Sequence, residues 1–302
     1  MRPRLVAAAY FGFGGDDDRL LRRVAAAQQL LHLGLCMHDD VIDGDRVRHG
    51  RSNVVGLAEL EARAAGFSTA AAARQGEASG ILAGDLALNA AVHALLSAPT
   101  ADATRLRLAE AALVAVERAI TGEILDVRSE QLAPASCDPL RVALLKTSSY
   151  SVTLPLLLGA LAAGTEVTPL LGALERIGAA FGIAYQLSDD DLGLFGSPAA
   201  TGKSATSDLR DGKRTEHIRL AHARADEEGR AVVDAVLGKA DASDGDADLV
   251  REIVTATGAR AAVHDLINWH LDHGIDIAFE NLPPALAAYL ADLAGALRGR
   301  EC

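Results

Sequence analysis

Apolar residues recur at helical spacing through most of this chain of 302 residues, and this periodicity narrows its fold more than any other feature. Alternating runs of β-branched residues, which would predict strands, are nearly absent. Aromatic residues make up only 4% of the chain, while Ala, Leu and Val are abundant, a composition that suits closely packed helices. The clearest helical segments are Ala25–Cys36, Ile81–Leu96, Arg105–Arg118, Val142–Ala163, Leu170–Leu187 and Arg251–Leu271.

Stretches rich in Gly, Pro and polar residues separate these segments and predict loops. None of them resembles a long linker between domains, and no internal repeat is evident. Half of the residues are hydrophobic, enough for one large core. We therefore predict an all-α bundle that forms a single domain over residues 1–302. The expected loops are Gly44–Asn53, Ala64–Gly80, Ala133–Pro139, Gly196–Gly212 and Gly238–Asp248.

Charge and cysteine usage limit the partners and the compartment. The net charge of −12, without a long basic run, argues against nucleic acid as a main partner. The three cysteines show no metal-binding or redox spacing, which is typical of thiols in a reducing cytosol, so we predict a cytoplasmic protein. No signal peptide is visible. The uncharged stretch Thr147–Thr165 contains Pro155 and Gly159, and we interpret it as a buried core helix rather than a transmembrane segment.

A first acidic cluster, Asp39-Asp40-Val41-Ile42-Asp43, closes one of the apolar helical segments. Asp39 and Asp43 are about one helical turn apart, so their carboxylates project from the same face and repel each other. A divalent cation reverses that repulsion, and Mg²⁺ favours carboxylate oxygens together with phosphate oxygens. The alternative is an acidic helix end exposed to solvent, which the helix dipole disfavours at a C-terminus.

A second acidic cluster, Asp189-Asp190-Asp191, closes another apolar segment, and Gln186 lies on the same helical face as Asp189. A buried helix is not expected to end in three acids unless they face water or a cation. Two such clusters, far apart in the chain, predict that the fold brings them together across a cavity. About three Mg²⁺ ions between them could clamp a diphosphate and neutralise the charge of departing pyrophosphate.

Basic residues accompany both acidic clusters. Lys146 lies in a segment otherwise free of charge, where an ammonium group is costly unless it meets an anion. Others follow the two clusters closely and can bind phosphate as cations or hydrogen-bond donors. A solvated surface charge stays the alternative for each of them. The candidates are Lys146, which precedes Thr147, and Arg48, His49, Arg51, Lys203 and Lys213.

In their order and spacing, these motifs resemble those of the polyprenyl synthetase family, the trans-isoprenyl diphosphate synthases. The resemblance runs from Met1 to about Ala221. Besides the two acidic clusters, the matching motifs are Arg48-His49-Gly50-Arg51, Gly76-Glu77-Ala78, Ala83-Gly84-Asp85, Gly122-Glu123-Ile124-Leu125-Asp126, Lys146-Thr147, Phe195-Gly196, Gly202-Lys203 and Asp208-Leu209-Arg210-Asp211-Gly212-Lys213.

The resemblance implies the type I isoprenoid synthase fold, a bundle of about ten helices around a deep central cavity, and a homodimer. It implies that an allylic diphosphate ionises, that isopentenyl diphosphate attacks the allylic cation, and that a proton is then lost. The implied Mg²⁺ ligands are Asp39, Asp40, Asp43, Asp189 and Asp190. The implied catalytic residues are Asp39, Asp43, Asp189, Lys146 and Lys203, and the implied substrate contacts are Arg2, Arg48, His49, Thr147, Gln186 and Lys213.

Three positions depart from the family pattern. Relatives begin with one or two further helices and a Gly-Gly-Lys-x-x-Arg-Pro motif, of which this chain keeps only Arg2 and Pro3. We therefore expect N-terminal helices to be missing and the isopentenyl diphosphate site to lack its lysine. His49 replaces the second arginine of a pair and is only partly charged near neutral pH. Gly193 ends the second motif where many members have Asp.

Two residues bear on product length. Gly34 and Leu35 stand five and four positions before Asp39, where aromatic residues in this family close the cavity and stop growth near fifteen carbons. Without a ring at either position, we predict a product of about twenty carbons or longer.

Three other functions fit the sequence less well than prenyl transfer. A class I terpene cyclase is also all-α and metal-dependent, but it usually carries an Asn-Ser-Glu type second motif rather than a second Asp pair. A non-catalytic or impaired homologue would fit the missing lysine, although the intact acidic motifs argue against it. A plain helical scaffold leaves the placed lysines unexplained. The sequence favours a Mg²⁺-dependent prenyltransferase that condenses isopentenyl diphosphate with an allylic diphosphate.

Overall fold

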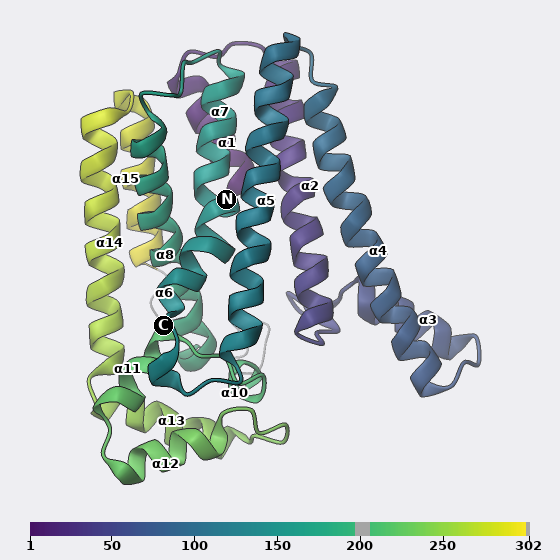
Figure 1. Cartoon of the computed structure of the whole chain (residues 1–302), viewed down its shortest axis with the longest axis vertical. Coiled ribbons are helices and arrows are strands. Elements are labelled where there is room, and N and C mark those ends of the chain that lie inside the picture. The colour runs from purple at the N-terminus through teal and green to yellow at the C-terminus, as the bar shows by residue number, and fades with distance from the viewer. Residues whose placement is uncertain (197–205, 300–302) are drawn as a thin grey trace.

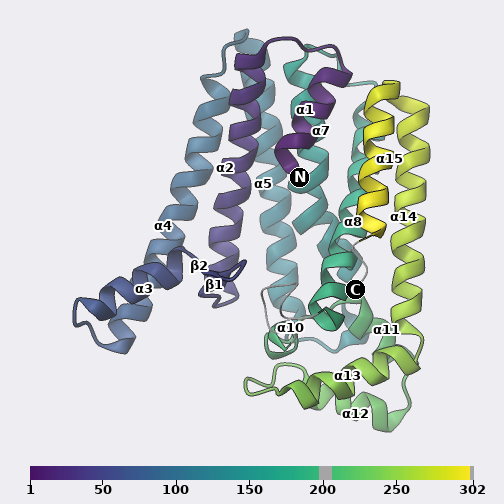
Figure 2. The same cartoon turned by 180° about the vertical axis from the view of Figure 1, so that it is seen from behind.

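The computed structural model describes residues 1–196 and 206–299, and these residues are almost entirely helical. Five long helices run along the long axis of the molecule (Figures 1 and 2): α2 (Asp18–Ile42), α4 (Thr69–Leu96), α5 (Asp102–Ser129), α8 (Leu171–Phe195) and α14 (Ala259–Asn281). The predicted all-α architecture is confirmed.

Shorter elements complete the bundle and its lower end, where α12 and α13 lie across the long helices and α3 projects to one side (Figures 1 and 2). The helices are α1 (Arg2–Gly12), α3 (Val54–Ala64), η1 (Pro134–Ser136), α6 (Pro139–Val142), η2 (Ala143–Thr153), α7 (Leu154–Ala162), α10 (Ser207–Arg210), α11 (Glu216–Arg224), α12 (Glu227–Val236), α13 (Asp244–Ala256) and α15 (Pro284–Arg298). The strands β1 (Val47–Arg48) and β2 (Arg51–Ser52) pair antiparallel.

Side chains cap several of these helices, as their sequences require. Asp17 accepts hydrogen bonds from the first backbone N–H groups of α2, and Ser68 does so for α4. Ser243 and Asp246 form a reciprocal capping box that starts α13 inside a segment predicted as a loop. The predicted loop Ala64–Gly80 is likewise mostly helical, because α4 already begins at Thr69. Short polar side chains begin helices as readily as they interrupt them, which explains both corrections.

One predicted helix is broken in two. The segment Arg251–Leu271 spans the end of α13 and the start of α14, which are separated at Gly258. Gly258 has φ +67°, a conformation that only glycine adopts at low cost. By contrast, the predicted segment Val142–Ala163 is continuously helical, although its hydrogen-bond pattern changes along its length.

Two apolar clusters hold the long helices together. One packs α1 and η2 against α8, α14 and α15, with Leu5, Phe181 and Leu271 fully buried. The other packs α1, α2 and α5 around α7, with Leu31 and Leu158 fully buried. Each such side chain contributes about 2–3 kcal/mol when removed from water. The rigid bundle therefore fixes the positions of the helix ends, where the charged motifs lie.

A π-helical stretch, η2, lies between α5 and α8. It approaches both closely because glycines face it: a Cβ atom at Gly122 of α5 would clash with the backbone nitrogen of Lys146, and one at Gly182 of α8 would clash with Ser148. Wide helical turns of this kind frequently occur at functional sites. Here the wide turn positions Lys146 and Thr147 between the helices that lead to the acidic motifs.

By length and hydropathy alone, two helical runs could cross a membrane: α4 and the run Pro139–Ala162. The second is mostly buried inside the bundle, as a core helix would be, whereas only 33% of the corresponding window of α4 is buried. The absence of a transmembrane segment and the single-domain organisation stay predictions.

Candidate active site

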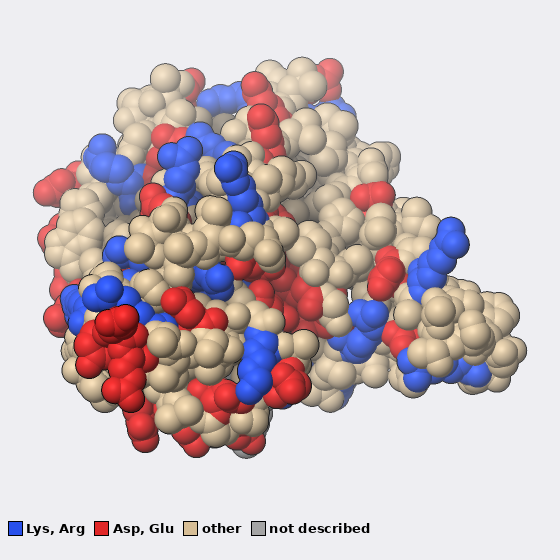
Figure 3. Space-filling view, turned by 60° about the horizontal axis from the view of Figure 1, so that its bottom comes forward, with Lys and Arg blue, Asp and Glu red and all other residues tan. Residues whose placement is uncertain are grey.

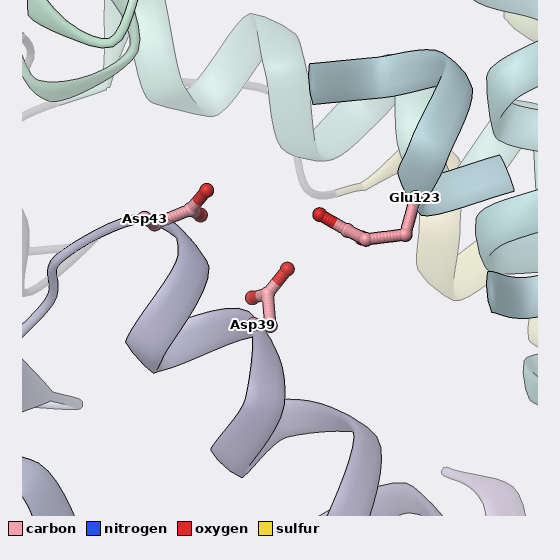
Figure 4. A group of neighbouring side chains, drawn as sticks. All are labelled: Asp39, Asp43 and Glu123. Atoms are coloured by element: carbon pink, nitrogen blue, oxygen red, sulfur yellow. The ribbon is translucent and has the colours of Figure 1, made fainter. Parts of the chain in front are cut away.

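Three carboxylates from two helices meet at the lower end of the bundle. Asp39 and Asp43 lie at the C-terminal end of α2, and Glu123 reaches toward them from α5 (Figure 4). One oxygen of each lies within 4.8 Å of the other two, and all three side chains are partly buried. Seen from this end, the surface is hollowed between the bundle and the projecting α3, and acidic side chains line the hollow (Figure 3).

Lys146 lies among these carboxylates. Its Nζ is 2.8 Å from Glu123 and from Asp126, and 3.2 Å from Asp39. Burial disfavours the ammonium form, but the surrounding carboxylates outweigh burial and raise the pKa of Lys146 above its ordinary value. Lys213, which follows the second motif, places its Nζ 2.8 Å from Asp43. Four carboxylates therefore face two ammonium groups, which leaves a surplus of negative charge.

The carboxylates differ in how readily they ionise. Burial raises the pKa of Asp43 and of Glu123 above their ordinary values. Burial acts on Asp39 in the same direction, but Lys146, Lys213 and Arg48 overcome it and lower its pKa to about 2. Within the described residues, Glu123 Oε1 is buried and has no hydrogen-bond partner. A buried acceptor without a donor, beside two further carboxylates, fits a hard divalent cation such as Mg²⁺.

A hydrogen-bond path joins the first acidic cluster to the second. Thr147, next to Lys146, donates from Oγ1 to Gln186 Oε1 at 2.6 Å, and Gln186 donates from Nε2 to Asp190 at 2.8 Å. Burial raises the pKa of Asp190 to about 8, and nearby carboxylates, including that of Asp126, act in the same direction. Because Asp126 also contacts Lys146, the two clusters border one charged region, while the predicted cavity between them stays a prediction.

Arg48 bridges Asp40 and Asp39 at the end of α2. Arg48 donates to Asp40 at 2.8 Å and to Asp39 at 2.9 Å, and Asp40 is only 3% exposed. The hairpin of β1 and β2 turns at His49 and Gly50, both with positive φ, and so returns Arg48 to the end of α2. Asp40 does not belong to the three-carboxylate group among the described residues, and His49 is exposed at the turn.

Arg2 lies beside η2 in a second cationic region. It donates to Ser151 Oγ at 2.8 Å, its Nη1 lies 3.1 Å from His32 Nε2, and its guanidinium covers the ring of Tyr150. Burial lowers the pKa of His32 to about 3, and the charges of Arg2 and Arg48 add to this effect. His32 is therefore neutral at physiological pH, and two arginines lie close enough to influence it.

Sequence reasoning did not select three residues that the structure brings to these regions. Glu123 and Asp126 belong to a quoted motif, but their roles depend on how α5 packs against α2 and η2. His32 lies about two helical turns before Asp39, on the same side of α2, and this spacing could have identified it. Of the predicted site residues, Lys203 lies outside the described residues.

Comparisons with known proteins agree with this arrangement. The profile of the family described as Polyprenyl synthetase matches residues 1–254. A (2E,6E)-farnesyl diphosphate synthase of Mycobacterium bovis is 30% identical over 316 residues, covering 100% of this chain and 79% of that relative. The crystal structure of geranylgeranyl pyrophosphate synthase from Corynebacterium glutamicum, complexed with isoprenyl diphosphate and magnesium, has a TM-score of 0.92 at 32% identity, covering 99% of this chain and 86% of that chain.

A polyprenyl synthase from Caulobacter crescentus, solved with calcium and isoprenyl diphosphate, has a TM-score of 0.82 at 26% identity and covers 99% of this chain and 84% of that chain. The predicted type I isoprenoid synthase fold is confirmed by these likenesses. With a family profile that spans most of its length and a relative of 30% identity aligned along all of it, the chain belongs to the polyprenyl synthetase family of prenyltransferases.

Proposed function

We propose that this protein condenses isopentenyl diphosphate with an allylic diphosphate to give a longer all-trans prenyl diphosphate, in a Mg²⁺-dependent reaction. One observation carries the proposal: the carboxylates of Asp39, Asp43 and Glu123 meet within 4.8 Å, against the ammonium group of Lys146. The comparisons do not support a terpene cyclase or a non-catalytic homologue, because the relatives found are named prenyl diphosphate synthases.

The charge balance of the site suits a diphosphate bound together with cations. In this structure the ammonium groups of Lys146 and Lys213 donate to carboxylates. A diphosphate would offer these ammonium groups new acceptors and release Asp39 and Asp43 to hold metal. Mg²⁺, when bound, would stabilise the charge on the departing pyrophosphate. Asp189 and Asp190 would hold further ions, about three in all, and Lys203 would contact the same diphosphate.

Arg2, His32 and Arg48 supply the second substrate site in this proposal. Isopentenyl diphosphate needs donors separated from those of the allylic diphosphate, yet close enough for its double bond to reach the allylic carbon. Arg2 and His32 lie beside η2, and Arg48 lies at the end of α2 next to Asp39. The guanidinium of Arg2 would exchange its bond to Ser151 for phosphate oxygens.

The proposed product has about twenty carbons or more, because no aromatic ring stands at position 34 or 35. Gly34 itself is buried against α4, and a Cβ atom there would lie 2.8 Å from Leu88 Cγ. A larger residue at this position would therefore push α2 away from α4. Relatives named for a farnesyl and for a geranylgeranyl product both match the chain, so product analysis has to distinguish the two lengths.

We also propose a cytoplasmic homodimer joined through α4 and α5. Many large apolar side chains of these two helices are exposed: Leu86 of α4 is 71% exposed and Ile124 of α5 is 63% exposed. Many exposed apolar side chains on two helices that pack together favour an interaction site there. Leu86→Glu should convert the dimer to monomer in light scattering after gel filtration, whereas Leu249→Glu, at an exposed position on α13, should not. A wild-type monomer would contradict this assignment.

The reaction itself is tested with purified protein, Mg²⁺, radiolabelled isopentenyl diphosphate and allylic starters of increasing length. Longer linear diphosphates that disappear on addition of EDTA are expected. Cyclic hydrocarbons would identify a cyclase instead, and unchanged substrates would identify a non-catalytic homologue. Chromatography of the dephosphorylated products gives chain length, and a farnesyl product alone would refute the proposed length.

A further inference from the structure

Asp191, the third aspartate of the second acidic cluster, belongs to a network outside the proposed metal site. Its carboxylate accepts two hydrogen bonds from Arg260 of α14, at 3.0 and 2.9 Å. It also lies 3.1 Å from Nε2 of His217 on α11 and 3.3 Å from Nε2 of His264 on α14. Asp191 is 4% exposed and His217 is fully buried.

Helical geometry explains why one of three consecutive aspartates has to face another way. Successive residues of an α-helix are about 100° apart, so Asp189, Asp190 and Asp191 do not share one face. A buried carboxylate without partners is costly, so Asp191 is stable only where Arg260 and the imidazoles meet it. The guanidinium of Arg260 also packs on the ring of Phe195, the last residue of α8, at 3.8 Å. The network therefore fixes both the rotation and the end of α8.

The same network reaches the segment that carries Lys213. His217 lies one turn of chain after Lys213, at the start of α11. The segment that leads to Lys213 also packs directly against α8. A Cβ atom at Gly193 of α8 would lie 2.6 Å from Oδ2 of Asp208 in that segment. Asp191 thus ties the helix that bears Asp190 to the segment whose lysine pairs with Asp43.

We propose that Asp191 is a positioning residue, which aligns the second acidic motif and Lys213 with the first motif so that both sides can hold one metal–diphosphate complex. This inference rests on the proposed function. It assigns Asp191 no contact with substrate or metal: its charge is already met by Arg260 and two imidazoles. Residues that orient ligands in this way typically affect metal affinity about 10–100-fold when changed.

The test measures binding of inorganic pyrophosphate in the presence of Mg²⁺, followed as thermal stabilisation of the protein, and in parallel the kinetic constants of the condensation. Asp191→Asn keeps the shape of the side chain and removes its charge. We expect the half-saturating pyrophosphate concentration to rise about 10-fold or more. Glu175→Gln is the matched control, because it removes a carboxylate of the same helix from an exposed pair with Arg118 and should leave this concentration unchanged.

Arg260→Lys provides a second variant, which keeps the positive charge and loses the two-pronged bond; it decides the question if Asp191→Asn does not fold. Arg260→Lys should weaken pyrophosphate binding in the same direction, and the double variant should bind no more weakly than the weaker single variant. A lower melting temperature with wild-type half-saturation in the variants would overturn the positioning role. A wild-type protein that Mg²⁺ and pyrophosphate fail to stabilise would instead overturn the proposed function.

Discussion

Two groups of carboxylates lie at the same end of the bundle and differ in how completely their charge is met. The proposed metal-site group, formed by Asp39, Asp43, Glu123 and Asp126, contacts the ammonium groups of Lys146 and Lys213, and Asp39 also accepts a hydrogen bond from Arg48, which it shares with Asp40. The anchoring network holds one carboxylate, Asp191, against Arg260 and two imidazoles. The side chain of Asp39 is 25% exposed, while that of Asp191 is 6% exposed.

The difference shows how a chain uses the same residue type for two purposes. Glu123 Oε1 lacks a donor within the described residues, so a cation would complete the proposed metal-site group. Both oxygens of Asp191 accept hydrogen bonds from Arg260, and two imidazoles lie beside them, so this carboxylate needs no cation. Among the described residues, Nδ1 of His217 is the one atom of this network that is buried without a hydrogen-bond partner. A surplus of charge suits binding, and a closed ion-pair network suits one fixed geometry.

The largest effect is expected at Asp43. Asp43→Asn should reduce the rate of condensation about 1,000-fold, because it removes a carboxylate that we propose to hold charge-stabilising metal. The free energy of unfolding should change by less than about 1 kcal/mol, since burial raises the pKa of Asp43 and the folded chain gains little from its charge. Steady-state assays and urea unfolding test the two parts. A variant that is strongly destabilised would show that this group holds the fold together.

Asp191→Asn should instead cause a large loss of stability, whereas Asp43→Asn mainly reduces the rate of condensation. Asp191 is buried and its pKa is lowered by His217 and Arg260, so its charge stabilises the folded state; removing that charge also removes two charge-assisted hydrogen bonds from Arg260, and we expect a loss of about 3 kcal/mol in the free energy of unfolding. Urea unfolding with wild-type protein and Glu175→Gln as references measures this loss. A change as small as that of Asp43→Asn would remove the distinction between the two groups.

Much of this arrangement could be predicted from the sequence, because it depends on local patterns. Helical periodicity identified the long helices, and aspartates that close apolar helices identified both acidic motifs. The cost of burying Lys146 without an anion predicted that it meets one; in the structure its neighbours are carboxylates, while its contact with a diphosphate stays a prediction.

The remainder depends on packing that no local pattern encodes. The family resemblance left Asp191 outside the implied metal ligands, but only the packing of α11 and α14 reveals the partners that this third aspartate takes. Glu123 becomes part of the site because Gly122 lets η2 approach α5. The segment Arg251–Leu271 was predicted as one helix, but the positive φ of Gly258 divides it into two.

Lys146→Gln tests whether the carboxylates of the proposed metal-site group carry a surplus of negative charge. Lys146 competes with divalent metal for three carboxylates, so its removal should strengthen binding of Mg²⁺ alone about 10-fold, even as catalysis is lost. Titration calorimetry in the absence of diphosphate measures this affinity. Lys239→Gln, which removes an ammonium group from a surface pair with Asp246, is the control and should bind like wild type. Weaker Mg²⁺ binding by Lys146→Gln would contradict the surplus of negative charge.

The smallest effect is expected at Asp211, beside the metal-site group. Burial raises its pKa to about 6, with Asp43 and Asp208 acting in the same direction. Between pH 4 and 6 the unfolded chain loses this proton first, so the folded state becomes less stable as pH rises through that window. Asp211→Asn should therefore match wild type at pH 4 and exceed it by about 1–2 kcal/mol at pH 8, allowing for partial exposure.

Urea unfolding at pH 4, 6 and 8 in the presence of EDTA tests this sign. Asp191 supplies the contrast, because Arg260 and His217 overcome its burial and lower its pKa. Its contribution to stability is present above the ordinary aspartate pKa and is lost as pH falls through its lowered value. The advantage of wild type over Asp191→Asn should thus persist at pH 8, where Asp211→Asn surpasses wild type. If both variants followed the same pH dependence, the two carboxylate groups would not differ in the way their partners imply.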